Sequence, residues 1–199
     1  FGLGRQGQLM AKRAYAFDMD VIGYDPFIKK QDVTETNVRL VTFDELLSES
    51  DLISLHAPLT AETKGIFGAN QFKQMKKTAS IINAARGGII DTEALVQAIQ
   101  SNQIAGAALD VTEPEPLPLD HPLRSLENVI LTPHVAFFSQ QSLQELSRRT
   151  AQQVFDGLIL QHRTAVTVWL PSWSYHCRCI LCHETVRSWL RFLQGFCRQ

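Results

Sequence analysis

Three side chains of this sequence, Arg86, Glu115 and His134, have the types that reduction of a 2-keto acid requires. The guanidinium fork of an arginine matches a carboxylate bidentately and would polarise the neighbouring carbonyl group. A histidine titrates near neutrality, so it can donate a proton while hydride reaches the carbonyl carbon, and a nearby carboxylate favours its charged form. Each residue also has a structural alternative: Arg86 as a surface charge, Glu115 as a solvated loop acid and His134 as a histidine with structural hydrogen bonds only.

The first eight residues, FGLGRQGQ, contain the G-x-G-x-x-G spacing of a dinucleotide-binding turn in Gly2, Gly4 and Gly7. We predict that Gly4 allows the tight turn and that Gly7 lets the following helix pack close to the sheet. Backbone N–H groups at the start of that helix would face a pyrophosphate. Asp25 lies 21 residues after Gly4, where a carboxylate would accept hydrogen bonds from ribose hydroxyls and repel a 2′-phosphate. The pattern favours NAD over NADP, and the alternative is that Asp25 only begins a turn.

The elements that must position these residues follow from the hydrophobic pattern. Short apolar runs predict strands at 21–25, 38–41, 51–58, 79–85, 104–111 and 129–132, and helical periodicity predicts helices at 8–17, 43–50, 70–75, 92–100 and 139–158. Asp91 is expected to cap the fourth of these helices. Because the strands are continuous apolar runs rather than alternating ones, we expect a doubly wound α/β fold with a mostly parallel sheet covered on both faces.

In such a sheet, ligands bind at the carboxyl ends of the strands. The candidates are therefore the residues that directly follow strands, at positions 2–7, 25, 56–58, 84–86, 110 and 133–134. Arg86 and His134 are therefore predicted to lie at the same edge of the sheet as the glycine turn.

Composition places the chain among globular proteins, with 45% hydrophobic and 20% charged residues. A net charge of -1 gives no overall field that would attract nucleic acid or an anionic membrane. There is no signal-peptide pattern and no long uncharged apolar run that would predict a membrane span. Composition changes near residue 160, because all 4 cysteines and all 3 tryptophans lie beyond residue 168. We therefore predict a domain over 1–158 and an atypical tail over 159–199.

Three interpretations of the tail stay open at HCRCILCH, residues 176–183. The cysteines and histidines could bind zinc, although a closed site usually needs ligand pairs separated by a longer loop. CILCH fits the c-type haem attachment pattern, which requires export. The third interpretation, a cysteine-rich tail without a function, is favoured, so we assign no metal site.

Six stretches resemble, in order, successive blocks of the D-isomer-specific 2-hydroxyacid dehydrogenases: FGLGRQGQ, VIGYDP, HAPLTAETKGIF, INAARGGIIDTEALVQAI, IAGAALDVTEPEPL and ILTPHVAFFS. This family includes phosphoglycerate dehydrogenase, glyoxylate and hydroxypyruvate reductases, and the C-terminal-binding-protein corepressors. The resemblance covers residues 1–158 and implies a Rossmann NAD-binding domain. It implies that Arg86 orients the substrate, that Glu115 is the carboxylate partner and that His134 is the acid/base. It also implies NAD contacts from Gly2, Gly4, Arg5, Gln6, Gly7, Asp25, Pro58, Ala84, Ala85, Arg86, Asp110 and His134.

The sequence departs from the family pattern in several places. Family members carry a substrate domain and a first Rossmann strand ahead of the glycine turn, so we expect a truncated form that lacks both. Gln6 stands where an apolar residue is usual, and Ala136 with Phe137 replaces a frequent glycine pair. Asp18 stands where a glycine commonly ends the first helix, and aspartate tolerates the left-handed conformation needed there.

The resemblance implies an NAD-dependent oxidoreductase that reduces 2-keto acids to D-2-hydroxyacids by hydride transfer. The alternative is a corepressor-like, NAD-sensing binding module without significant catalysis. We further expect a small 2-keto or 2-hydroxy acid as substrate, a homodimer formed through the NAD-binding domain, no direct contact with nucleic acid or membrane, and a cytoplasmic location.

Overall fold

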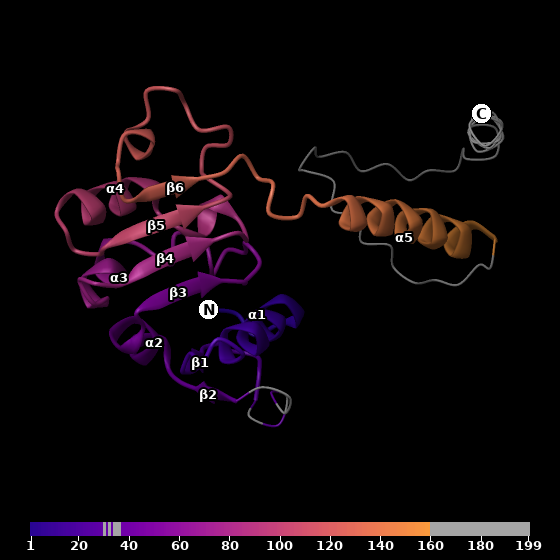
Figure 1. Ribbon diagram of the computed structural model, residues 1–199, viewed down its shortest axis with the longest axis horizontal. Coiled ribbons are helices and arrows are strands. Elements are labelled where there is room, and N and C mark those ends of the chain that lie inside the picture. Colours follow the sequence, from indigo (N-terminus) through magenta and orange to yellow (C-terminus); the bar gives the residue numbers. More distant parts are fainter. Residues whose placement is uncertain (30, 32, 34–36, 160–199) are drawn as a thin grey trace. The chain divides into compact units, whose positions relative to one another are not determined.

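The computed structural model in Figure 1 describes residues 1–29, 31, 33 and 37–159. The chain divides into two compact units, Phe1–Leu143 and Gln144–Gln199. The domain boundary expected after residue 158 stays a prediction. The zinc and haem interpretations of residues 176–183 concern a segment outside the described residues. Within the described part, no helix is long and apolar enough to cross a membrane, and no group of three metal-ligating side chains occurs.

Strands and helices alternate along the first unit, and each predicted run becomes an element. The strands are β1 (Val21–Gly23), β2 (Val38–Leu40), β3 (Leu52–Leu55), β4 (Ser80–Asn83), β5 (Gly106–Leu109) and β6 (Val129–Leu131). The helices are α1 (Arg5–Tyr15), α2 (Phe43–Glu49), α3 (Ala69–Gln74), α4 (Thr92–Gln100) and α5 (Gln140–Ile159), with short 3₁₀ turns η2 (Gly87–Ile89) and η3 (Pro122–Arg124). The last helix, α5, starts in the first unit and continues into the second.

All described strand pairs are parallel, which confirms the predicted α/β class. β1 pairs with β2, and the other four strands pair in the order β3-β4-β5-β6 (Figure 1). Segment 1–3 lies between these two groups, because the N–H of Gly2 donates to the carbonyl of Tyr24 at 2.8 Å and the N–H of His56 donates to the carbonyl of Phe1 at 2.8 Å. The glycine turn is thus held at the carboxyl ends of both β1 and β3.

The core lies against one face of the four-stranded sheet. Leu47 of α2, Phe72 of α3 and Leu95 of α4 are buried in one cluster with the strand residues Ile53 and Ile81. The helix α1 connects segment 1–3 to β1, and this crossover runs across the sheet in the direction opposite to the crossovers through α3 and α4. Because such crossovers are right-handed, α1 lies on the other face of the sheet. This arrangement is doubly wound, as predicted.

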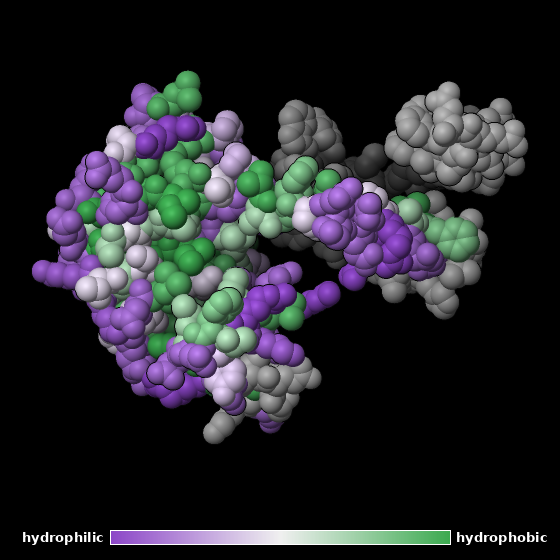
Figure 2. Space-filling view, viewed as in Figure 1, coloured by the Kyte–Doolittle hydropathy of each residue, from purple (hydrophilic) through white to green (hydrophobic). Residues whose placement is uncertain are grey.

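The second face of the sheet is less covered than the sequence predicts. Leu52 of β3 and Ile130 of β6 are 47% and 67% exposed. In Figure 2, hydrophobic residues form a band down the middle of the first unit, with hydrophilic residues along its outer edge. The expectation that both faces of every strand are covered is therefore wrong for these two strands in the described part of the chain. An apolar run predicts that a strand is buried, but it does not predict which element covers the strand.

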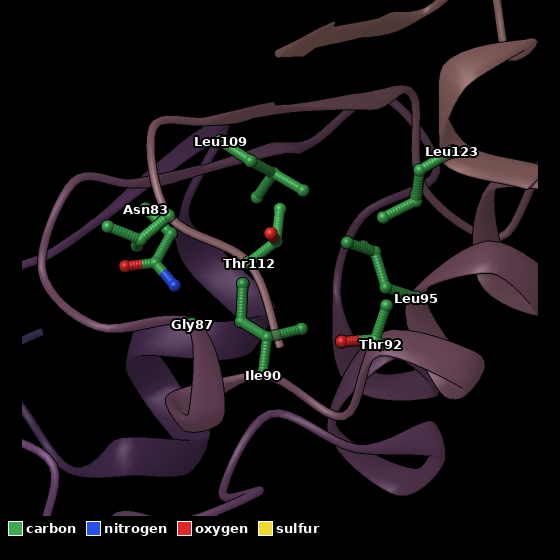
Figure 3. A pocket seen from close by; sticks show the side chains of 9 residues that line it. Asn83, Gly87, Ile90, Thr92, Leu95, Leu109, Thr112 and Leu123 are labelled. Carbon is green, nitrogen blue, oxygen red and sulfur yellow. The ribbon is translucent and has the colours of Figure 1, made fainter. Parts of the chain in front are cut away.

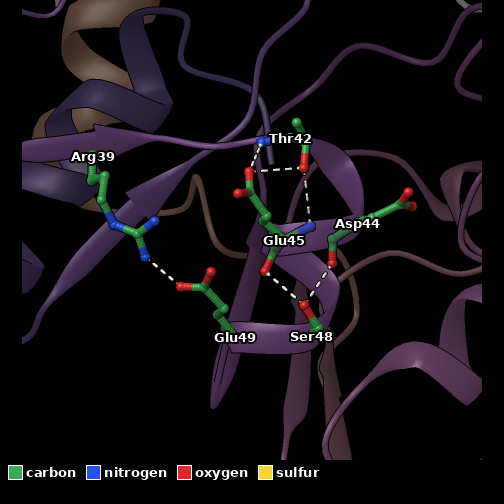
Figure 4. A network of polar contacts seen from close by, with 6 residues as sticks. All are labelled: Arg39, Thr42, Asp44, Glu45, Ser48 and Glu49. Carbon is green, nitrogen blue, oxygen red and sulfur yellow. Dashed lines mark hydrogen bonds and ion pairs between the residues drawn. The ribbon is translucent and has the colours of Figure 1, made fainter.

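A capping box starts α2 directly after β2 (Figure 4). The N–H of Glu45 donates to Oγ1 of Thr42 at 3.2 Å, and the N–H of Thr42 donates to Oε2 of Glu45 at 2.7 Å. The backbone and side-chain hydrogen bonds from Thr42 lower the pKa of Glu45. Arg39 of β2 and Glu49 at the end of α2 form an exposed ion pair that closes the same corner. Local sequence therefore fixes the strand-to-helix turn on one flank of the sheet.

Two further helix ends follow the sequence prediction. Oδ1 of Asp91 accepts the N–H of Ala94 at 3.0 Å and caps α4. Asp18 has φ of 59° after the end of α1, which confirms the left-handed conformation expected there.

Candidate functional site

The glycine turn is shaped by Gly2 and Gly7. Gly2 has φ of +86°, and a Cβ built on it would lie 2.8 Å from the backbone nitrogen of Ala57. A Cβ on Gly7 would lie 2.0 Å from the carbonyl oxygen of Gly2, which confirms that Gly7 allows α1 to start against the sheet. Gly4 has an ordinary φ of -62°. The tight turn predicted for Gly4 is therefore made by Gly2, and that prediction is wrong because spacing alone does not say which glycine takes the unusual conformation.

The space beside Gly4 is open. A Cβ built there would meet nothing within 4 Å, and the following residues, Arg5 and Gln6, are the exposed first turn of α1. The first N–H groups of a helix have no partner within the helix and carry a partial positive charge. An anionic group has room to approach these N–H groups, which is the fit that a pyrophosphate needs.

Asp25 ties the glycine turn to the end of β1. Its Oδ2 accepts the N–H of Leu3 at 2.8 Å, and its Oδ1 accepts the N–H of Phe27 at 2.9 Å. The second bond is the local turn that the sequence offered as an alternative. The first bond places the carboxylate beside the glycine turn, where the ribose contact predicted for Asp25 would have to occur.

His56 follows β3 beside the same turn, next to Ala57 and Pro58. Its Nε2 lies 2.9 Å from Oγ of Ser54. Burial lowers the pKa of His56 below its usual value. The His56 side chain is therefore neutral at pH 7, and it packs half-buried beside the glycine turn.

The loop after β4 is folded by Asn83, whose side chain is buried. Its Oδ1 accepts the N–H of Ala85 at 3.0 Å, and its Nδ2 donates to the carbonyl of Arg86 at 2.9 Å. A Cβ on Gly87 would lie 2.1 Å from the carbonyl oxygen of Thr112. The loop that carries Ala84, Ala85 and Arg86 therefore packs against the segment that leads to Glu115.

Glu115 and His134, which are 19 residues apart in sequence, meet directly. Nδ1 of His134 lies 2.6 Å from Oε1 of Glu115, and the two side chains are 42% and 43% exposed. The expected partnership is therefore present in the geometry, here called the His134–Glu115 pair. Because Nδ1 faces the carboxylate, Nε2 is the nitrogen left to meet a substrate.

Asp110 holds the turn on which His134 sits. His134 has φ of 54°, and its N–H donates to the carbonyl of Asp110 at 2.8 Å. The Asp110 carboxylate accepts the hydroxyl of Thr132 at 2.6 Å and the N–H groups of Val135 and Ala136 at 2.8 and 2.9 Å. Burial opposes ionisation of Asp110, but these hydrogen bonds and the nearby His134 outweigh it, so the pKa of Asp110 is lowered.

A pocket of about 490 Å³ opens at the His134–Glu115 pair. Its wall is formed by Asp110, Thr112, Glu115, Pro116, Leu117, Arg124, Leu131, Thr132, Pro133 and His134. A second cavity, between Asn83, Leu95 and Leu123, measures about 10 Å³ (Figure 3). This cavity has room for a water molecule at most, so of the two the larger pocket is the candidate ligand site.

Arg86 lies outside the wall of the larger pocket. The structure therefore brings together two of the three predicted catalytic residues and places the third on the neighbouring loop. Sequence reasoning missed Arg124 and Thr132, which reach the site through the fold of the loops after β5 and β6. Thr132 is the last residue of a predicted strand, and this position was the only signal available for it.

Comparisons with known proteins identify the family of this chain. Residues 1–136 match the family model "D-isomer specific 2-hydroxyacid dehydrogenase, NAD binding domain". The chain is 48% identical over 141 residues to a D-3-phosphoglycerate dehydrogenase of Archaeoglobus fulgidus, covering 71% of the chain and 27% of the relative. It is 45% identical over 162 residues to a glyoxylate reductase of Thermofilum pendens, covering 78% of the chain and 47% of the relative. The chain thus spans about a quarter to a half of the length of these relatives.

Solved structures show the same fold. An NAD complex of a D-isomer specific 2-hydroxyacid dehydrogenase from Lactobacillus delbrueckii ssp. bulgaricus matches with a TM-score of 0.71 and 33% identity, over 78% of this chain and 51% of that one. The D-lactate dehydrogenase of Aquifex aeolicus, complexed with NAD and lactic acid, matches with a TM-score of 0.70 and 37% identity, over the same shares, 78% and 51%.

Proposed function

Because this chain belongs to the D-isomer specific 2-hydroxyacid dehydrogenase family, as its NAD-binding domain, we propose that it carries the cofactor site and the proton donor for reduction of a 2-keto acid. The observation that supports this proposal most directly is the 2.6 Å contact between Nδ1 of His134 and Oε1 of Glu115 at the mouth of the pocket. A histidine oriented by a carboxylate is the arrangement that proton transfer to a carbonyl oxygen needs.

NAD fits the edge formed by the glycine turn and the loops after the strands. The open space at Gly4 and the start of α1 would take the pyrophosphate. The carboxylate of Asp25 would hold the ribose, and the loops that carry Pro58, Ala85 and Asp110 would line the rest of the cofactor. When bound, the reduced nicotinamide supplies the hydride.

The residues of this chain handle the proton. Nε2 of a protonated His134 donates to the keto oxygen, and Glu115 holds the ring through Nδ1 and stabilises its positive charge before the transfer. Arg86 would bind the substrate carboxylate in a bidentate manner. After the transfer His134 is neutral, and it recovers a proton from solvent through its half-exposed edge.

The alternative, an NAD-sensing binding module, uses the same cofactor residues without turnover. The His134–Glu115 pair favours catalysis, because cofactor binding alone does not require a histidine oriented in this way. Dimerisation through this domain and a cytoplasmic location stay predictions that belong to the same proposal.

The test is NADH oxidation by the full chain with glyoxylate, hydroxypyruvate and pyruvate, beside NADH binding measured by fluorescence. We expect His134→Gln to lower turnover by roughly 10²- to 10⁴-fold and to leave NADH binding unchanged. Undiminished turnover in this variant would contradict the assigned proton donor. NADH binding without turnover of any of the three acids would support the binding module instead.

A further inference from the structure

The pocket at the His134–Glu115 pair has a guanidinium group on its wall. Arg124, at the end of η3, is exposed and lines the pocket together with Glu115 and His134. Its Nε donates to the carbonyl of Pro118 at 2.8 Å, and its Nη2 donates to the carbonyl of Leu117 at 2.7 Å. Two hydrogen bonds to consecutive carbonyls fix the plane of the guanidinium, so little side-chain freedom remains to be lost when a ligand binds.

The charge of Arg124 is not neutralised by another residue of the pocket. Glu115 is paired with His134, and the Asp110 carboxylate accepts three hydrogen bonds. Both acceptors of Arg124 are neutral carbonyl groups, and none of the ion pairs among the described residues includes it. Its Nη1 makes no hydrogen bond within that part of the chain. The pocket therefore presents a positive group with a donor nitrogen to spare.

The size of the pocket is consistent with a substrate longer than the keto acid unit. Sites that bury small molecules measure about 300–1,000 Å³, and this pocket of about 490 Å³ lies within that range. The His134–Glu115 pair would act on the keto oxygen, and Arg86, outside the pocket wall, would hold the adjoining carboxylate. The far end of a longer substrate would then lie along the wall that Arg124 occupies.

We propose that Arg124 binds a second anionic group of the substrate, so that the site selects 2-keto acids with a carboxylate or phosphate remote from the keto group. This inference rests on the proposed function. The partly fixed guanidinium matches either oxyanion.

The experiment uses the full chain saturated with NAD⁺, which cannot reduce a keto acid, and two acids of equal length, 2-oxoglutarate and 2-oxopentanoate, which differ in the terminal carboxylate. Isothermal titration calorimetry should show that 2-oxoglutarate binds about 10- to 100-fold more tightly, as expected for a hydrogen bond between charged groups. Arg124→Gln should abolish this preference. Loosening of the loop at residues 117–118 would weaken binding of both acids by the same factor, so the ratio of the two affinities is the quantity that tests the inference. Arg124→Lys should keep part of the preference. Arg39→Gln, which removes an arginine from a distant ion pair, is the matched control and should change neither affinity.

Inorganic phosphate distinguishes the two anions. If the site prefers phosphate, phosphate should compete with 2-oxoglutarate but not with 2-oxopentanoate, and this competition should disappear in Arg124→Gln. If phosphate does not compete, the second group is a carboxylate.

Two results would overturn the inference. The first is equal binding, or no binding, of the two acids by the wild-type chain. The second is an equal loss of both affinities in Arg124→Gln, which would show that Arg124 only holds the loop at residues 117–118. Turnover of pyruvate or glyoxylate alongside either result would leave the proposed function standing. A clear preference for 2-oxoglutarate without any turnover would contradict the proposed function alone.

Discussion

Replacing Asp110 with asparagine tests whether one buried carboxylate holds His134, the proposed proton donor, in position. An asparagine can keep one acceptor oxygen, for Thr132 and Val135, but its amide nitrogen would then face the N–H of Ala136. One buried donor is left unpaired, at a cost of about 1–3 kcal/mol, and the two remaining bonds lose their charge assistance. His134 also holds a left-handed backbone, which costs of order 1–3 kcal/mol and persists only where its surroundings enforce it. We expect Asp110→Asn to lower the free energy of unfolding by roughly 2–4 kcal/mol.

Urea denaturation without NAD measures this loss apart from any effect on cofactor binding. The pKa of Asp110 is lower in the folded chain than in the unfolded chain, so its stabilisation is complete above the ordinary aspartate pKa of about 4 and is lost as pH falls through the folded value. The difference between wild type and Asp110→Asn should therefore shrink below about pH 4. Asp51→Asn, which removes an exposed partner of Lys76, is the control and should cost no more than about 1 kcal/mol. A loss for Asp110→Asn as small as that of the control, or one that does not change down to pH 3, would refute this account.

Four further substitutions test other parts of the site and fold. Gly7→Ala should destabilise the chain by about 1–3 kcal/mol in urea denaturation, because the clash of the new methyl group with the carbonyl of Gly2 costs more free energy than the higher helix propensity of alanine contributes. Gly4→Ala places its methyl group in open space, so it should keep the stability and weaken only NADH binding. Asp25→Ala should weaken NADH binding by about tenfold in a fluorescence titration, and tighter binding of NADPH than NADH by the wild-type chain would contradict the role of Asp25. Thr42→Ala removes the cap of α2 and should cost about 1 kcal/mol in thermal or urea unfolding; no measurable cost would show that tertiary packing alone holds this helix.

The sequence predicts most of the fold because its signals are local. Apolar runs locate the six strands, and side chains such as Asp91 and Asp18 mark helix ends through bonds or backbone angles within a few residues. The His134–Glu115 pair was also accessible, since both residues follow strands of one parallel sheet and so return to the same edge.

The parts that the sequence did not predict depend on contacts between distant segments. Arg124 lies in no motif, and it reaches the pocket only because the loop after β5 folds back so that the guanidinium meets the carbonyls of Leu117 and Pro118. The tight turn predicted for Gly4 is made by Gly2, because the glycine that needs an unusual backbone is decided by the close approach of Ala57 from the segment after β3. Such information appears only when the strands are placed side by side.

These contacts also explain how His134, the proposed proton donor, can be held precisely on a loop. The His134–Glu115 pair joins two loops, and each loop is tied by one charged side chain to neutral hydrogen-bonding groups. Asp110 accepts three donors from the loop of His134, and Arg124 donates to two carbonyls of the loop that follows Glu115. Because an ionised partner makes each of these bonds stronger than a neutral one, both loops are held before any substrate arrives. Little conformational entropy is then lost in forming the 2.6 Å contact of the pair when a keto acid binds. Such pre-organisation is the condition for an efficient proton transfer.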